Sequence, residues 1–92
     1  MATASMALLR KAAEPGVRRH EFMDATRMAS HTHLPEVHLA ALESANRSIR
    51  LAAWRNPNLS NLGRPAIEAL LEKIPEDDHV IRESGKRALS HC

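Results

Sequence analysis

The chain has 92 residues, 43% of them apolar, and its 13 Lys and Arg against 11 Asp and Glu give a formal net charge of +2. This composition excludes an intrinsically disordered chain and predicts one small helical domain over 1–92, and the small net charge does not require a polyanionic partner. No run of 18 apolar residues occurs, Cys92 is the only cysteine, and the N-terminus lacks the basic start of a signal peptide, so we expect a cytoplasmic protein without membrane contact.

The apolar residues are mostly of the kind that favours helices. Fifteen Ala and eleven Leu stand against seven Val and Ile, one Phe, one Trp and no Tyr. Ala and Leu lose little entropy in a helix, whereas strands draw on β-branched and aromatic residues. The composition therefore predicts an all-α protein.

The first half of the chain predicts three short helices. Met6, Leu9 and Ala13 recur at helical spacing in the first of them, and a less regular apolar stripe follows in the second. Pro35 suits the first turn of the third, where a missing N–H is tolerated. We expect these helices over roughly 2–13, 16–30 and 35–44.

The second half predicts three more helices, so that six short helices stack as antiparallel pairs in a minimal solenoid or a compact bundle. Asn46 or Ser48 is placed to cap the fourth helix. The one long loop covers 55–65 and holds three Asn, a Gly and two Pro, a mixture typical of turns. The last three helices are expected over roughly 47–55, 62–73 and 78–90.

Three similar sites recur along the chain at a constant interval. Arg18, Arg50 and Arg82 are separated by 32 residues, and the residue before each of them is β-branched: Val17, Ile49 and Ile81. A period of this length with two helices per unit is typical of an α-solenoid, in which each helix pair packs against its neighbours in sequence.

The segment 49–89, "IRLAAWRN…RPAIEALLEKIPEDDHVIRESGKRAL", resembles a HEAT-type repeat. It shows a hydrophobic–Arg start, an Ala-rich first helix, a Pro-Ala opening to the second helix, an acidic turn and the next hydrophobic–Arg pair. Residues 17–48 match more loosely. Gly85 departs from the pattern and is expected to weaken the last helix by about 1 kcal/mol relative to Ala.

The resemblance implies a polar ladder between adjacent repeats, formed by an Asp in the turn and an Arg. Asp77 or Asp78, near Arg82, is the candidate for this ladder, while Arg50 has only Glu43 nearby in sequence. Because Arg–carboxylate pairs fix geometry well, we interpret the repeated arginines as structural rather than catalytic.

We expect non-catalytic recognition of a macromolecule, because stacked helix pairs present a surface of parallel helices and seldom carry out chemistry. The partner would be a larger protein or protein complex, and the chain a small adaptor or inhibitor. Trp54 fills the core between repeats or anchors an interface, since Trp and Arg are enriched in hot spots. The candidate surface comprises Arg47, Arg50, Trp54, Arg55, Asn58 and Arg64. Self-association is also expected, because a short solenoid leaves its apolar ends open.

An alternative interpretation is a DNA-binding regulator. Residues 40–74 resemble the second half of a phage-repressor-type helix-turn-helix domain, with an "Arg-Ser…Ile…Trp" recognition helix before "Asn-Pro-x-Leu-x-x-Leu". The resemblance implies that four residues face the major groove: Asn46, Arg47, Ser48 and Arg50. This alternative leaves the 32-residue period unexplained.

The sequence offers little for catalysis or cofactors. There is no Gly-flanked Ser, no internal Cys and no Gly-rich phosphate loop, so we expect neither an enzyme nor a cofactor. His31, His33 and His38 lie close together with Glu36, which raises the hypothesis of a zinc site. Their spacing is not that of a helical ligand pair, and we interpret them as surface or capping residues.

Overall fold

The computed structural model describes residues 2–74 and 78–90, so Asp77 and Cys92 lie outside the described residues. Over these ranges the chain is all-α, as predicted, with six α-helices and one short 3₁₀ helix. Their boundaries agree with the sequence prediction to within a few residues. The elements are α1 (Ala2–Ala12), α2 (Arg19–His31), α3 (Pro35–Leu42), α4 (Arg47–Trp54), η1 (Leu59–Leu62), α5 (Arg64–Glu72) and α6 (His79–Leu89).

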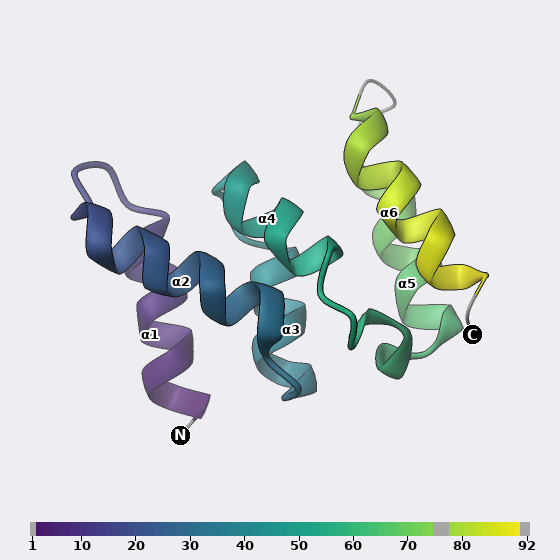
Figure 1. Cartoon of the computed structure of the whole chain (residues 1–92), viewed down its shortest axis with the longest axis horizontal. Coiled ribbons are helices and arrows are strands. Elements are labelled where there is room, and N and C mark those ends of the chain that lie inside the picture. The colour runs from purple at the N-terminus through teal and green to yellow at the C-terminus, as the bar shows by residue number, and fades with distance from the viewer. Residues whose placement is uncertain (1, 75–77, 91–92) are drawn as a thin grey trace.

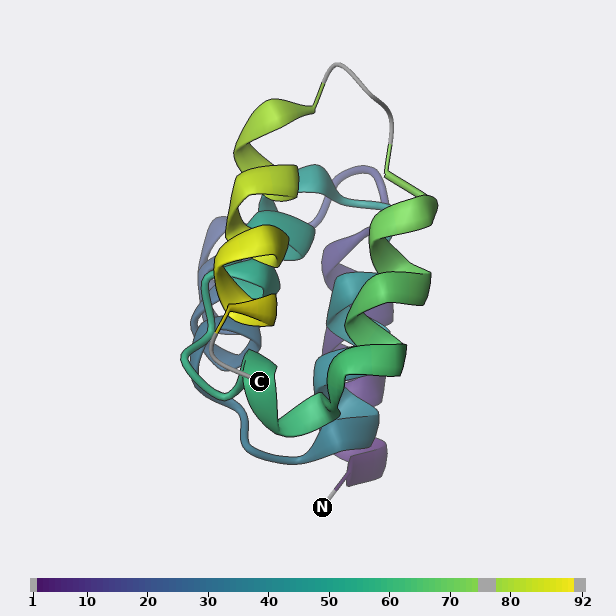
Figure 2. The ribbon, with the colours of Figure 1, turned by 90° about the vertical axis from the view of Figure 1, so that its right-hand side faces the viewer.

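The six helices form two layers (Figures 1 and 2). One layer holds α2, α4 and α6, the other holds α1, α3 and α5, and consecutive helices pair across the layers. The molecule is therefore a flat stack of three antiparallel helix pairs, 35 × 30 × 16 Å in extent. We call the contact between the first and second pairs the first seam, and the contact between the second and third pairs the second seam.

Local chemistry explains where several helices begin. The Asn46 side chain caps α4 by accepting hydrogen bonds from the backbone N–H of Ser48 (2.9 Å) and Ile49 (3.2 Å), so the prediction of Asn46 as a cap is confirmed. Proline occupies the first turn of α3 and α5, where no N–H is needed. Gly63 precedes α5 with φ of 91°, a conformation that glycine adopts without steric cost.

The connection over 55–65 is more ordered than the predicted open loop. It contains η1, and Leu59 at the start of η1 is 2% exposed and belongs to the core. The hydrophobic contact of Leu59 fixes the path of the chain between α4 and α5. This segment therefore helps to shape the second seam.

The first seam is a close helix–helix contact between α2 and α4. Ala25 and Ala29 on α2 and Ala53 on α4 are completely buried, and small side chains let helix axes approach closely. The Asn56 amide donates hydrogen bonds to the carbonyls of Ala29 (3.0 Å) and Thr32 (2.9 Å), two orphan acceptors at the end of α2. Between α2 and α4 the first seam is thus closed by small residues and by a buried polar clamp, whereas between α1 and α3 a cavity of about 380 Å³ remains.

The second seam centres on Trp54, which is 3% exposed, at the end of α4. A Cβ added to Gly85 of α6 would meet the Cζ3 atom of Trp54 and the Cγ atom of Leu71 at 3.0 Å each. The glycine that the sequence marked as a weak point of the last helix is therefore required for the close approach of α6. Trp54 fills the core between the second and third pairs.

The 32-residue period holds for two of its three sites. Ile49 and Ile81 are each the third residue of a helix, α4 and α6, and both are buried in the core. Val17 instead lies ahead of α2 and is half-buried. The β-branched residue therefore has the same position within its helix in the second and third pairs, but not in the first pair. Within the described ranges no helix has the length and apolar character needed to cross a membrane.

Candidate binding surface

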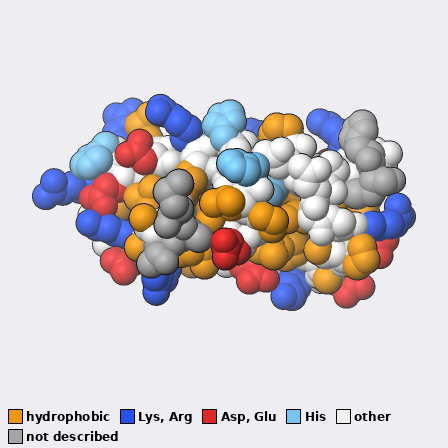
Figure 3. Space-filling view, turned by 90° about the horizontal axis from the view of Figure 1, so that it is seen from below, with side chains coloured by type: hydrophobic (Ala, Val, Ile, Leu, Met, Phe, Trp, Pro, Cys, Tyr) orange, Lys and Arg blue, Asp and Glu red, His pale blue; other side chains and the backbone are white. Residues whose placement is uncertain are grey.

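Charge is unevenly distributed between the two layers. All thirteen basic side chains and nine of the eleven acidic ones are in the part of the chain that the structure describes; nine of these basic side chains, but only four of these acidic ones, lie on α2, α4, α6 or their cap residues. The basic ones are Arg18, Arg19, Arg27, Arg47, Arg50, Arg55, Arg82, Lys86 and Arg87. Seen from below, acidic side chains are more frequent along one long edge of the molecule, where Lys and Arg also occur, and Lys, Arg and His predominate along the other (Figure 3). The α2/α4/α6 layer is therefore the positive side of the stack.

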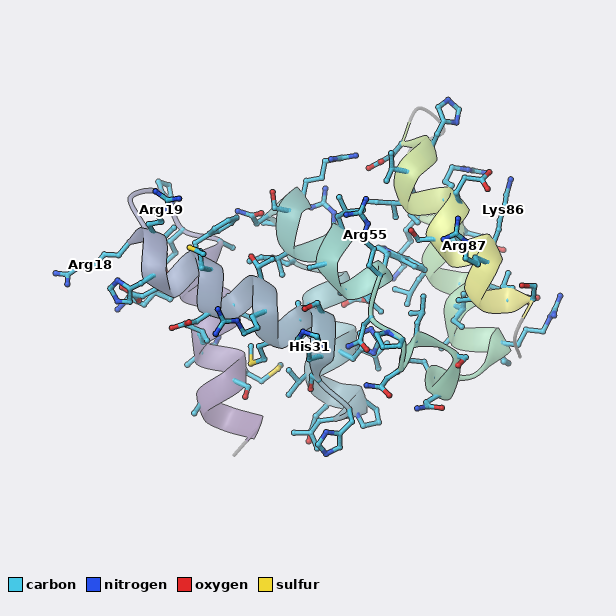
Figure 4. All side chains as sticks on the ribbon, in the orientation of Figure 1. Arg18, Arg19, His31, Arg55, Lys86 and Arg87 are labelled. Carbon is cyan, nitrogen blue, oxygen red and sulfur yellow. The ribbon has the colours of Figure 1, made fainter. Side chains whose placement is uncertain are left out.

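Most cations of this layer are free to meet a partner. Arg18, Arg19, Arg55, Lys86 and Arg87 are exposed, and none of their side chains bonds or pairs with another group among the described residues. Figure 4 shows them spread over α2, α4 and α6, with His31 on the same layer. In addition, Lys11 of α1 forms an ion pair with Glu21 of α2, with 3.0 Å between Nζ and Oε2, and so offsets one acidic charge of this layer. A cation without an internal partner keeps its full charge available for a ligand.

Arg47 and Asp78 connect the second and third helix pairs. The Arg47 guanidinium donates two hydrogen bonds to the Asp78 carboxylate, from Nη2 at 2.8 Å and from Nε at 3.2 Å. These hydrogen bonds hold the pKa of the Asp78 carboxyl below its ordinary value. A turn Asp does bridge neighbouring pairs, as the resemblance implied, but its partner is Arg47 and not Arg82.

Three other residues of the predicted surface are held by neighbours in the fold. Arg50 donates from Nη1 to the Ser44 carbonyl at 2.7 Å, not to Glu43. Asn58 donates to the Thr32 carbonyl at 3.2 Å, and so adds to the polar clamp on the end of α2. Arg64 pairs with Glu68 at 2.8 Å on α5, in the other layer. All three side chains therefore already have a partner within the fold.

A cavity of about 360 Å³ opens between α4, η1 and α6, and we call it the α4–α6 pocket. Trp54, Leu59 and Ala88 supply an apolar floor, and the exposed Arg55 and Arg87 stand beside it. Nine residues line it: Trp54, Arg55, Asn56, Pro57, Leu59, Ser60, Ser84, Arg87 and Ala88. The pocket therefore combines apolar surface with two cations that have no described internal partner.

A second cavity of about 550 Å³ lies at the opposite end of the same seam, next to the Arg47–Asp78 pair. Leu42, Trp54 and Ile81 contribute apolar surface to it. Its charged residues occur with both signs: Arg50 and Lys73 stand with Glu43 and Asp78. This balanced set gives the larger cavity no preference for an anion or a cation. Trp54 lines both cavities.

The histidine cluster separates in the fold. His38 is 1% exposed, and its Nε2 lies 2.9 Å from the Ala53 carbonyl oxygen, to which it donates. Burial lowers the pKa of His38 below 6.5, so the ring is neutral near neutral pH. His31 and His33 are exposed. No group of three potential metal ligands converges in the part of the chain that the structure describes.

Of the six predicted site residues, two line the α4–α6 pocket, namely Trp54 and Arg55. The other four do not line it: Arg47, Arg50, Asn58 and Arg64. The residue that sequence reasoning missed is Arg87. A usable signal was present, because Arg87 follows Arg55 by the same 32 residues that separate Ile49 and Ile81. No protein-family model, no curated protein and no solved structure matches the chain.

Proposed function

We propose that this chain is a non-catalytic protein-binding module whose α2/α4/α6 layer docks on an acidic surface of a larger protein. The observation that carries this proposal is the concentration, on one layer of the stack, of exposed cations that have no partner among the described residues. Complementary potentials steer association and discriminate between partners. A module of this size can join two proteins as an adaptor or occlude a site as an inhibitor.

The architecture supports the same conclusion. Three helix pairs stacked in two layers are the arrangement of a minimal solenoid, and we propose that the resemblance to HEAT-type repeats reflects this construction. Such stacks offer a broad face built from parallel helices. Here α2, α4 and α6 form that face, and the outward cations come from all three helices (Figure 4).

The test compares two triple variants with equal changes in charge. The first, Arg19→Gln/Arg55→Gln/Lys86→Gln, removes three cations from the α2/α4/α6 layer. The second, Arg10→Gln/Arg64→Gln/Lys73→Gln, removes three from the other layer. Tagged chains are incubated with nuclease-treated extract of the native host, and the captured proteins are identified by mass spectrometry. We expect the same acidic partner with wild type and the second variant, and at least tenfold less with the first.

Equal capture by all three chains would refute the docking face. A parallel capture from untreated extract serves as the comparison: capture that occurs there but is lost after nuclease treatment would show that the ligand is nucleic acid. The variants should be compared at two salt concentrations, because interactions between exposed charges weaken as the ionic strength rises. A partner whose capture is independent of salt would contradict an electrostatic docking face.

A DNA-binding regulator is the second candidate, because a basic layer also suits phosphates. The helix-turn-helix interpretation assigns Arg47 and Arg50 to the major groove. Both arginines already have partners, namely Asp78 and the Ser44 carbonyl. The helix-turn-helix interpretation requires these contacts to break, whereas docking through Arg19, Arg55 and Lys86 leaves them intact. Binding to random duplex DNA that is lost on changing Arg47 and Arg50 would favour the second candidate.

Self-association through the ends of the stack remains a separate prediction. The terminal pairs, α1/α2 and α5/α6, each pack against one neighbouring pair. A second copy would cover an end that the fold leaves open. A light-scattering mass of twice the chain mass of 10.2 kDa would support it, and a monomer mass over a wide concentration range would exclude it.

A further inference from the structure

We propose that the α4–α6 pocket binds a carboxylate that stands next to a bulky apolar side chain in an acidic segment of the partner. This inference rests on the proposed function and names the chemistry that the docking face recognises. The two parts of the ligand match the two parts of the pocket. The apolar side chain lies over Trp54, Leu59 and Ala88, and the carboxylate is held between Arg55 and Arg87.

The arginines are arranged by the repeat. Arg55 follows the last residue of α4, and Arg87 occupies the equivalent place in α6, because each lies eight residues after the first residue of its helix. The two helices are neighbours in one layer, and both arginines line the pocket between them (Figure 4). Two guanidinium groups at one cavity give up to ten N–H donors, and Arg suits the geometry of carboxylates.

The helix ends explain only part of this arrangement. A cation near the C-terminus of a helix is favoured by the helix dipole, which accounts for an arginine at the end of α4 and in the last turn of α6. The dipole does not require the two side chains to meet at one apolar cavity. Lys86 is in the same last turn and has the same charge, but it does not line the pocket. What distinguishes Arg55 and Arg87 from Lys86 is therefore their place in the lining of the cavity.

The size and composition of the cavity limit the occupant. A volume of about 360 Å³ is at the lower end of ligand pockets and suits one or two side chains rather than a folded element. An ion without apolar surface would contact the two cations but would make no use of the apolar part of the lining. A neutral apolar side chain would leave both arginines without partners. Charge complementarity with a carboxylate beside an aromatic or aliphatic group satisfies both surfaces.

The experiment uses the full chain and its own fluorescence. Trp54 is the only tryptophan and lines the pocket, so its emission reports on occupancy. The probe is 3-phenylpropionate, which joins a carboxylate to an aromatic ring. Acetate tests the charge alone, 3-phenylpropanol tests the ring alone, and phenyl phosphate tests a phosphate in place of the carboxylate. A hexapeptide with adjacent Glu and Phe, and its Gln counterpart, extend the test to a peptide.

We expect 3-phenylpropionate and the Glu peptide to change the Trp54 emission saturably, and acetate, 3-phenylpropanol and the Gln peptide to bind at least tenfold more weakly. Arg55→Gln and Arg87→Gln should each weaken probe binding by about tenfold or more, as expected for lost hydrogen bonds to a charged group. The matched control is Lys86→Gln, which removes one charge from the same turn of α6 and should leave affinity within about twofold. Circular dichroism verifies that all variants fold.

Each contrary result has a distinct meaning. If Lys86→Gln weakens binding as much as Arg87→Gln, the layer acts through diffuse charge, so the pocket assignment fails while the docking face stands. Tenfold tighter binding of phenyl phosphate would overturn the carboxylate in favour of a phosphate. Competition by duplex DNA that depends on Arg55 and Arg87 would overturn the peptide as occupant. If no probe binds while partner capture persists, the pocket has no part in recognition.

Discussion

The two seams of the stack join similar helix pairs by different means. The first seam closes on the fully buried Ala25, Ala29 and Ala53, with Asn56 donating to the end of α2. The second seam is bridged by the bulk of Trp54 against Gly85, and a cavity remains at each end of it. One tryptophan separates two helices locally but cannot fill the space along their full length. Within the α2/α4/α6 layer, the first seam is therefore closed and the second leaves room for a ligand.

The difference also determines where function can arise in such a small chain. If α4 and α6 packed as closely as α2 and α4 do, the α2/α4/α6 layer would offer a partner only its outer face. Here the looser contact lies between α4 and α6, and both helices belong to the positive layer. The cavity and the exposed Arg55 and Arg87 therefore coincide with the proposed docking face. The comparison predicts that disturbing either seam costs stability, but that only changes at the second seam affect the pocket.

The largest effect is expected for Trp54→Ala. Removing this buried side chain opens the two cavities into each other and should lower the free energy of unfolding by about 3–5 kcal/mol. Urea denaturation followed by circular dichroism measures the loss. Trp54→Phe, which keeps an aromatic ring between α4 and Gly85, should lose less than half as much. A loss below about 1 kcal/mol for Trp54→Ala would mean that the second seam does not depend on this side chain.

The next effect concerns the first seam. Ala29→Leu adds three carbons where no space remains, and it should cost about 1–3 kcal/mol of unfolding free energy. The matched control is Ala69→Leu on the exposed side of α5, which should stay within about 0.5 kcal/mol of wild type. Because the pocket belongs to the other seam, Ala29→Leu should leave 3-phenylpropionate binding unchanged. Loss of binding in a folded Ala29→Leu variant would contradict the independence of the two seams.

Gly85→Ala tests the close approach of α6. Its expected effect on the free energy of unfolding is opposite in sign to the effect of the same change in an exposed helix. In an exposed helix this change would stabilise by about 1 kcal/mol, because Ala is the better helix former. Here the added methyl meets Trp54 and Leu71, so we expect a net loss of about 1 kcal/mol. A thermal melt gives the sign directly. The control is Gly16→Ala, where nothing lies within 4 Å of the added Cβ but φ is 81°, so any loss there reflects backbone strain alone. A higher melting temperature for Gly85→Ala would show that α6 has room to move.

The sequence predicted the helices well because their signals are local. Apolar spacing, proline in first turns and the Asn46 cap each act within a few residues, so six helices could be located from the chain alone. Proximity in sequence was a poor guide to polar partners. Arg47 lies 31 residues from Asp78, and neither its own helix nor the turn pattern identifies that pairing. Long-range pairs depend on how the helices stack, which short motifs do not encode.

The candidate site was predicted in part for the same reason. Arg55 and Trp54 were identified because a loop follows them, but the predicted surface also included Arg47, Arg50 and Asn58, whose side chains the fold uses internally. An exposed arginine and one that bonds to a carbonyl look alike in sequence. Arg87 becomes visible only when the 32-residue period is extended from the helix starts to the helix ends. Gly85 likewise shows its role only beside Trp54.

The smallest expected effect is a dependence of stability on pH through His38, which joins α3 to the end of α4. The folded chain lowers the pKa of His38 below the unfolded value of 6.5, so the unfolded chain binds a proton more readily. The stabilisation is therefore complete above pH 6.5 and is lost progressively as the pH falls from 6.5 towards the folded pKa. Urea denaturation about one pH unit above and below 6.5 measures it.

His38→Gln, which keeps an N–H donor for the Ala53 carbonyl, should reduce this pH dependence, whereas His31→Gln at an exposed site should preserve it. The same titration reports on both seams, because Ala53 is adjacent to Trp54 in α4. If acid weakens the α3–α4 contact within one cooperative unit, Trp54 fluorescence and helicity should fall together. If fluorescence changes at a higher pH than helicity, the second seam opens before the first, and the order of opening follows the difference in packing.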